Sequence, residues 1–566
     1  MLSSQSGSGW CIVGCLPLGR IPVLNRLIWH KLLACLTLTS LAVAQSIANR
    51  VALTENSYAD VNDAYGAIGL IDSGLAKSYD GRSREEWEKI YQEKRRRLVA
   101  GLKSLPSKEL SKEDKRAVMI MRSSLHDLPE NSSAAAQAGV KCKDASRRHI
   151  AYGRLREALY TCFDEVGNNL HFEGRAVRRL SVFDLLTQIQ EPDRRKAAFL
   201  AFAPLWQAIN GEDQRQSPYR RVIKMAAGDA QKHSSQIADA ARTVGASPDE
   251  VEHWLEQILD TWRQVSGEQP MEPWNFWYRA GETDRRLTSA IPGGALQPLN
   301  ERYYHDLGAD VKQLGILYDL DVRPGKAPIA YTDFVTRGRM IDGVWRRSVM
   351  RVSANYAGGG MGALNELVHE NGHAIHGAAI RTRPAFMDMG DALFVEAFAD
   401  VTSWSVYEPA WQRRYLGRDD GEAASIRGLF SNVVMDVAWA LFEIRMLGTP
   451  GADPNRVWTE ITSRYLHIVP HPEWSWWAVR GQLVDSPGYM VNYGLGAVLT
   501  ADLREHIRES FGPFDAGNAG WYEWISERLL RKGEEQDTAE LLREFLGRPI
   551  GPGALLRQIG RIKGGE

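Results

Sequence analysis

The chain has 566 residues and a formal net charge of −1, with 25% charged and 44% hydrophobic residues. This is the composition of a globular protein that is long enough for one large core or two medium ones. The balanced charge lacks the basic excess of nucleic-acid-binding proteins, so we expect no nucleic-acid partner.

The N-terminal segment has the pattern of an export signal. Arg26, His30 and Lys31 precede an apolar stretch over residues 32–44, which ends in Ala-Val-Ala. This stretch is too short to cross a bilayer as a helix. We therefore expect residues 1–44 to be a signal peptide and the protein to be exported, periplasmic or secreted, with no stable membrane span after cleavage. Because the segment before the basic residues is unusually long, an over-long N-terminus or a signal anchor stays open as an alternative.

Two of the five cysteines, Cys142 and Cys162, lie beyond the predicted signal. In an exported protein such a pair can form a disulfide. Two free thiols are the alternative, and we expect neither cysteine to bind zinc.

The rest of the chain is predicted to be mainly α. Helical patterning occurs over residues 83–104, 176–210, 235–266, 420–447 and 495–510. A short β-like segment over residues 348–354 precedes a glycine-rich run, and the edge of such a strand can hydrogen-bond an extended peptide. No linker rich in Pro, Gly or Ser divides the chain, so we expect a single helical unit over residues 45–566.

The most informative segment is His369-Glu370-Asn371-Gly372-His373, an HExxH sequence. Residues four apart lie on one face of a helix, so the two histidines can present nitrogens to one tetrahedral Zn²⁺ ion. Glu396, further along the chain, supplies a carboxylate as a third ligand. Glu370 is adjacent to a ligand and can take a proton from water at the open fourth position. The pattern predicts a zinc hydrolase site with its general base.

The flanks of this segment favour two helices that carry the site. Apolar residues recur at near-helical spacing around the histidines and around Glu396. Asp400 is four residues beyond Glu396 and shares its face, where it can orient a ligand histidine from outside the metal shell. Gly372 in mid-helix costs about 1 kcal/mol against alanine, which indicates close approach to a neighbouring element. We expect His376 to be a packing or surface residue.

Two interpretations without catalysis stay open at this point. The HExxH sequence can be a coincidence on a solvated helix, and the zinc can be structural in a non-catalytic exported binding protein. Glu396 argues against the first interpretation. Glu370 argues against the second, because a purely structural site needs no base.

Residues 363–376 resemble the HExGHxxH core of the thimet oligopeptidase and oligoendopeptidase F family of gluzincin metallopeptidases. Weaker similarities to this family occur at residues 172–174, 274–278, 319–326 and 394–397. The resemblance implies a large helical zincin fold, with a short β-sheet beside the active-site helix and two lobes around a deep substrate channel. It also implies a zinc-dependent oligopeptidase of short, unstructured peptides, with His369, His373 and Glu396 on the metal and Glu370 as base.

A second similarity concerns the side of the site that would bind the substrate. Residues 488–493 resemble the family's GYxxxY segment, whose tyrosines face the metal. By this resemblance Tyr493 can donate a hydrogen bond to the oxyanion of the tetrahedral intermediate, and Tyr489 is the second candidate for this role. The alternative is two tyrosines that only pack in a helix. The family usually has a histidine shortly before this segment, whereas residues 483–485 are Leu-Val-Asp here.

Several residues upstream of that segment are further candidates. His467 and His471 can substitute for the missing histidine.

Residues 396–400 also resemble the angiotensin-converting-enzyme family, which removes C-terminal dipeptides, so a peptidyl-dipeptidase is the alternative activity. Such enzymes bind the terminal carboxylate with basic and polar side chains, and Arg480 is the nearby cation. The tryptophans at positions 474, 476 and 477 either line a channel or pack in the core.

Overall fold

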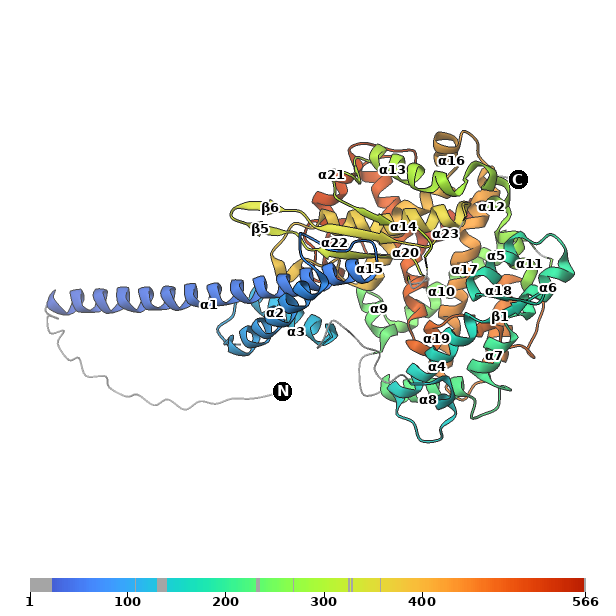
Figure 1. The fold of residues 1–566 in the computed structure, drawn as a ribbon, viewed down its shortest axis with the longest axis horizontal. Helices are drawn as coiled ribbons and strands as arrows, with labels where there is room; N and C mark the ends of the chain where they lie inside the picture. The colour runs from blue at the N-terminus through green and yellow to red at the C-terminus, as the bar shows by residue number, and fades with distance from the viewer. Residues whose placement is uncertain are drawn as a thin grey trace, which may run out of the picture.

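The computed structural model describes residues 23–563, apart from residues 107, 130–139, 231–234, 268, 324–325, 327–328 and 357. Helices make up most of the described chain, and the strands are few and short (Figure 1). The prediction of a mainly α fold with a short sheet beside the helix of the HExxH sequence is confirmed.

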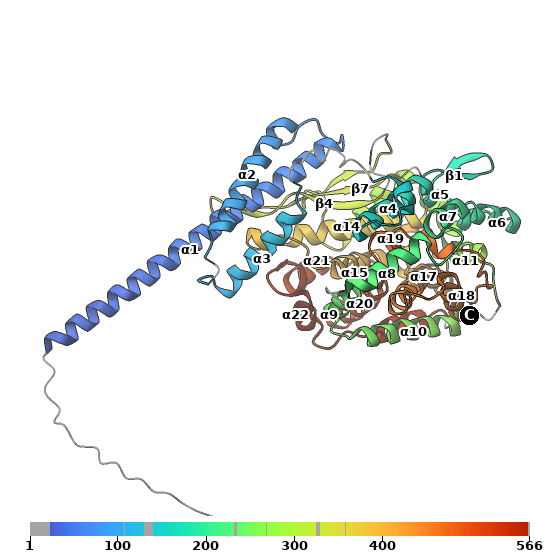
Figure 2. The same ribbon diagram turned by 90° about the horizontal axis from the view of Figure 1, so that it is seen from below.

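The first three helices form a layer on one side of the molecule (Figures 1 and 2). They are α1 (Val23–Asp72), α2 (Arg84–Ser104) and α3 (Lys112–Asp127). They bury a hydrophobic cluster of their own, which includes Tyr58 and Tyr91 and also takes in Phe386 from the larger part of the molecule. The layer is therefore attached to the larger part by shared core packing.

Residues 23–44 of the predicted signal peptide fall on the outer half of α1, which projects from the body (Figure 1). Residues 1–22 and the side chains of residues 23–46 lie outside what the structure describes, so the signal peptide and its cleavage stay predictions. Among the helices described, none is long and apolar enough to cross a membrane.

Two of the predicted helices are divided in the structure. Residues 176–210 begin with the end of strand β2 (Arg175–Val177) and continue as α5 (Arg179–Gln188), α6 (Pro192–Leu200) and α7 (Ala203–Asn210). Pro192 has no N–H to continue a helix and instead occupies the first turn of α6. Residues 235–266 form α9 (Gln236–Val244) and α10 (Pro248–Val265), because Gly245 ends α9 in the left-handed conformation with φ of +74°.

The helices that frame the site are predicted more closely. They are α14 (Met361–Ala379), α15 (Ala392–Ser403), α17 (Glu422–Gly448) and α20 (Met490–Ser510). The other helices are α4 (Tyr152–Gly167), α8 (Pro218–Ala230), α11 (Pro273–Ala280), α12 (Glu282–Leu287), α13 (Leu296–Asp306), α16 (Pro409–Leu416), α18 (Pro454–Leu466), α19 (Gln482–Asp485), α21 (Trp521–Ile525), α22 (Thr538–Leu546) and α23 (Gly553–Gly560).

The sheet beside α14 has three strands in the order β3 (Leu317–Asp319), β7 (Val349–Ser353) and β4 (Tyr331–Thr336). Strand β7 is parallel to β3 and antiparallel to β4. The predicted strand over residues 348–354 is thus β7. Because β7 is the central strand, both of its edges are already paired, and a peptide cannot add to it as we expected. Two hairpins, β1 (Leu170–Phe172) with β2 and β5 (Arg339–Ile341) with β6 (Val344–Arg346), complete the strands described.

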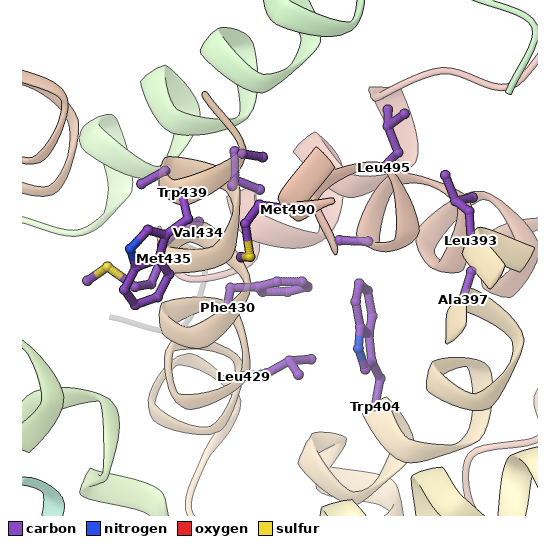
Figure 3. Close-up of a cluster of buried hydrophobic side chains, with 14 of the residues drawn as sticks. Leu393, Ala397, Trp404, Leu429, Phe430, Val434, Met435, Trp439, Met490 and Leu495 are labelled. Atoms are coloured by element: carbon purple, nitrogen blue, oxygen red, sulfur yellow. The ribbon is translucent and has the colours of Figure 1, made fainter. Parts of the chain in front are cut away.

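A continuous hydrophobic core lies between α15, α17 and α20. Figure 3 shows Leu393 of α15, Phe430 of α17 and Met490 of α20 in this cluster, together with Trp404. Trp404 and Phe430 meet edge to face, with ring centroids 5.3 Å apart. The core therefore fixes the helix that carries Glu396 against the helix that carries the two tyrosines.

Gly372 lies at a close approach between α14 and α15. A Cβ atom at this position would lie 2.8 Å from the Cα of Ala399 and 3.0 Å from its carbonyl oxygen. Real Cβ atoms do not come that close to backbone, so only glycine fits without a shift of one helix. The predicted close approach at Gly372 is confirmed, and it is what brings the histidines of α14 to Glu396.

Cys142 and Cys162 form a disulfide that joins the short helical turn over residues 142–146 to α4. The alternative of two free thiols is therefore wrong. The bond links residues 20 positions apart.

Candidate active site

Helices α14 and α15 bring His369, His373 and Glu396 together. Nε2 of His369 lies 3.1 Å from Nε2 of His373 and 3.2 Å from Oε2 of Glu396, and the third distance in this triangle is 3.8 Å. Atoms that share a tetrahedral zinc ion lie about 3.3 Å apart when their bonds to it are near 2.05 Å. The three donor atoms therefore have the chemistry and the spacing of a zinc site, and they form the group within the described residues that fits a metal ion.

Asp400 lies behind the first histidine, as its position on the face of Glu396 predicts. Its Oδ1 is 2.8 Å from Nδ1 of His369 and accepts a hydrogen bond from Ser403 at 2.7 Å. With Nδ1 held by a carboxylate, Nε2 of His369 is the nitrogen that faces Glu396. The two side chains of Glu396 and Asp400 are 42% and 34% exposed, so solvent reaches the site.

The electrostatics favour positive charge where these groups meet. Burial lowers the pKa of His369, but Asp400 and Glu396 outweigh it and raise this pKa well above its ordinary value. Burial, and then the neighbouring His369, lower the pKa of His373 to about 3. Burial raises the pKa of Glu396, but the two histidines outweigh that effect and the net pKa is lowered. Glu396 is therefore ionised and His373 is neutral, as a metal requires, whereas the two carboxylates favour a proton on His369 that a bound metal ion would displace.

Glu370 is fixed by the sheet rather than by its own helix. The hydroxyl of Thr332, on β4, donates to the carboxylate Oε2 and lies equally close to the backbone oxygen of Glu370, both at 2.8 Å. Burial raises the pKa of Glu370. A carboxylate of raised pKa beside the candidate metal position is suited to take a proton from water and return it later. No sequence signal pointed to Thr332.

Further side chains hold the backbone of α14 in place. The hydroxyl of Tyr304 donates to the carbonyl oxygen of Val368 at 2.6 Å, and the hydroxyl of Tyr522 donates to that of Ile375 at 3.0 Å. Both tyrosines come from helices distant in the chain. Their contacts fix the helix that presents the two histidines.

The two candidate tyrosines lie at the start of α20. The ring centroids of Tyr489 and Tyr493 are 5.8 Å apart. Burial raises the pKa of Tyr493 to about 12 against the opposing charge of Arg480, and burial followed by the charge of Glu396 raises the pKa of Tyr489. Tyr493 therefore keeps its proton at neutral pH and can donate it. Its oxygen accepts a hydrogen bond from Nε2 of Gln482 at 3.2 Å, which leaves the phenol proton free for another acceptor.

Neither histidine that could replace the missing family residue reaches this position. His467 contacts the carbonyl oxygen of Arg263, and His471 contacts Glu272 and Glu473. The side chain beside Tyr493 is Gln482, which the sequence did not single out.

Glu443 is a second residue that the sequence did not reveal. It is fully buried on α17, and its two carboxylate oxygens accept the backbone N–H groups of Gly488 at 2.9 Å and Met490 at 2.8 Å. These N–H groups flank Tyr489, and Gly488 has a φ of +96°. Glu443 thus fixes the turn from which α20 and its tyrosines start. Its burial raises its pKa to about 8.

His376 and the tryptophans are packing residues. His376 is 1% exposed and meets the rings of Phe394 and Phe398 edge to face. Trp476 and Trp477 are buried in the core, and Trp474 packs against Phe199, Trp206 and Trp274. The interpretation of the tryptophans as core residues is the correct one.

Comparison with known proteins gives one kind of match. No protein-family model and no curated protein is similar to the chain. Among solved structures, the fold is similar to that of a chain described as PZ peptidase A with inhibitor 2, with a TM-score of 0.55 and 16% sequence identity. The match covers 89% of this chain and 86% of that chain. The helical fold of this chain is therefore similar to the fold of that PZ peptidase structure.

Proposed function

We propose that this protein is a zinc-dependent oligopeptidase that hydrolyses short, unstructured peptides. The observation that carries the proposal is the meeting of three zinc-type donor atoms on α14 and α15, with the carboxylate of Glu370 fixed beside them by Thr332. A structural zinc site has no need of a base held in this way. The peptidase fold and the order of the motifs along the chain support membership of the thimet oligopeptidase and oligoendopeptidase F family.

In this mechanism His369, His373 and Glu396 hold the zinc ion, and Asp400 orients His369. The bound ion supplies Lewis-acid chemistry, which polarises the scissile carbonyl and acidifies water. Glu370 takes a proton from the attacking water and passes it to the leaving amine. Tyr493, with Tyr489 beside it, donates a hydrogen bond to the oxyanion that forms on the substrate.

The Glu370→Gln variant tests this function. We expect it to keep one zinc per chain, because no ligand is changed, and to lose roughly 10³-fold or more in kcat, because the base is gone. Metal analysis and hydrolysis of a quenched peptide measure both quantities. A variant that cleaves peptides at the wild-type rate would refute the role of Glu370, and a wild-type protein that binds zinc but cleaves nothing would favour a non-catalytic binding protein.

We also propose export, with residues 45–566 as one catalytic unit. The predicted signal over residues 1–44 supports this, and so does the Cys142–Cys162 disulfide, since such bonds persist in oxidising compartments. Shared packing through Phe386 supports a single unit. N-terminal sequencing of the protein recovered from an expressing cell is the test, and a mature chain that starts at Gln45 is the expected result.

A further inference from the structure

Arg179, at the start of α5, is a cation for which the described residues supply no carboxylate. Its Nη1 donates one hydrogen bond, to the carbonyl oxygen of Val479 at 3.3 Å. Its guanidinium otherwise lies over the rings of Phe163 at 5.2 Å and Phe183 at 5.9 Å. Burial, and then the charge of Arg480, lower its pKa to about 10, so it stays charged at neutral pH. A charge that is partly removed from water without a partner is costly, and such a cost points to a ligand.

Arg480, the cation that the sequence singled out, is in a different state. Its Nη2 contacts the carboxylate of Asp436 on α17, so its charge is paired. Its guanidinium lies over the ring of Trp439 at 4.6 Å and over that of Tyr493 at 5.9 Å. Arg480 therefore has a fixed position beside the candidate oxyanion tyrosine. Of these two arginines, Arg179 is the one without a carboxylate partner among the described residues.

The two arginines lie on the tyrosine side of the candidate active site. Tyr493, under Arg480, is close enough to Glu396 for that carboxylate to raise its pKa. Asp436, the partner of Arg480, interacts in the same way with Asp400. Arg179 contacts the carbonyl oxygen of Val479, the neighbour of Arg480, and Arg480 lies over Tyr493, so a series of contacts leads from Tyr493 to Arg179.

We propose that Arg179 binds a carboxylate of the peptide substrate on the side of Tyr493. The inference rests on the proposed peptidase function. The guanidinium fork matches a carboxylate in two parallel hydrogen bonds, and Arg179 donates one hydrogen bond within the described part of the chain. A peptide offers this group at its C-terminus or on an Asp or Glu side chain. Recognition of the C-terminus would make the enzyme release short C-terminal fragments.

The test compares three peptides with one internal sequence: a C-terminal acid, a C-terminal amide, and an amide with a single Glu beyond the cleaved bond. Binding is measured by fluorescence anisotropy in the Glu370→Gln background, which separates affinity from turnover. We expect one of the two carboxylate peptides to bind about tenfold or more tightly than the plain amide. The peptide that does so identifies the source of the carboxylate.

Variants of Arg179 assign this preference. Arg179→Gln should abolish the difference between the peptides, and Arg179→Lys, which keeps the charge but loses the fork, should show an intermediate difference. Arg178→Gln is the matched control, because Arg178 is the exposed neighbour, and it should keep the full difference. Equal binding of all three peptides, or a difference that survives in Arg179→Gln, would overturn the inference. Failure of the wild type to cleave any peptide would instead count against the proposed function, since binding is measured independently.

Discussion

The candidate site has a metal half, which contains the two histidines and Glu396, and a tyrosine half, which contains Tyr493 and its neighbours. The two halves are built from different numbers of sequence segments. The candidate zinc donors and Asp400 come from α14 and α15, two helices that follow one another and touch at Gly372. The tyrosine half draws on α5, on α17 and on the consecutive helices α19 and α20, and long stretches of sequence separate these three parts. The metal half thus depends on one helix pair. The tyrosine half depends on the packing of the larger part of the molecule, so changes to the two halves should have different signatures.

The largest effect is expected in the metal half. His373→Ala removes one of three zinc donors, so affinity for zinc should fall by more than about 100-fold and activity should fall with it. His376→Leu is the matched control, because this histidine lies on the same helix and only packs against aromatic rings. Zinc content after dialysis decides the outcome. If His373→Ala keeps its zinc, or if His376→Leu loses it, the ligand assignment is wrong.

In the tyrosine half, Tyr493→Phe should lower kcat by about 10²-fold while the zinc content stays unchanged. The variant removes only a hydroxyl, so the packing against Tyr489 is kept. Tyr489→Phe serves as the comparison and should have the smaller effect. Steady-state kinetics with a quenched peptide measure both variants. An unchanged kcat in Tyr493→Phe would show that the phenol does not stabilise the oxyanion.

A smaller effect is expected at Asp400, which contacts the candidate ligand His369 from outside the metal site. Asp400→Asn keeps the size of the side chain but removes the charge that orients His369, so zinc affinity should fall about 10-fold. Competition with a chelator of known affinity measures this change. Zinc binding as tight as in the wild type would mean that Ser403 and the backbone of α14 orient the histidine without the aspartate.

The last prediction concerns stability, not activity, and uses pH. Glu443 holds its proton in the folded protein up to a pKa of about 8, whereas in the unfolded chain it ionises near its ordinary value. The folded state therefore binds more protons between these values, and the stability contributed by Glu443 at low pH is lost as pH rises towards 8. Relative to wild type, Glu443→Gln should gain stability with rising pH, by at most about 1.4 kcal/mol per pH unit.

Denaturant unfolding of both proteins between pH 5 and pH 8.5 measures this difference, which should level off above pH 8. A difference that does not change with pH would mean that Glu443 is ionised in the folded protein. A change of the opposite sign would mean that the two N–H donors from Gly488 and Met490 outweigh burial.

The spacing and type of neighbouring residues explain which parts of the fold and of the site could be predicted. The positions of His369, Glu370 and His373 on one helix, and of Glu396 and Asp400 on the next, follow from spacing that a helix turns into a shared face. The strand over residues 348–354 was also recognised from its residues. The helix breaks at Pro192 and Gly245 were signalled by residue types that end helices, but the apolar periodicity continues across them and hid the breaks.

The sequence alone determined which residue types the metal half holds and their helical spacing, from which the zinc ligands and the base are proposed, and it indicated that Gly372 meets another element. Only the tertiary structure decided that Thr332 holds Glu370 and that Gln482 hydrogen-bonds Tyr493. It also decided that Glu443 fixes the start of α20 and that Arg179 has no carboxylate partner among the described residues. The reason is physical. Ligands four residues apart are brought together by the helix itself, whereas these other groups meet only because β4, α5, α17, α19 and α20 pack around one site.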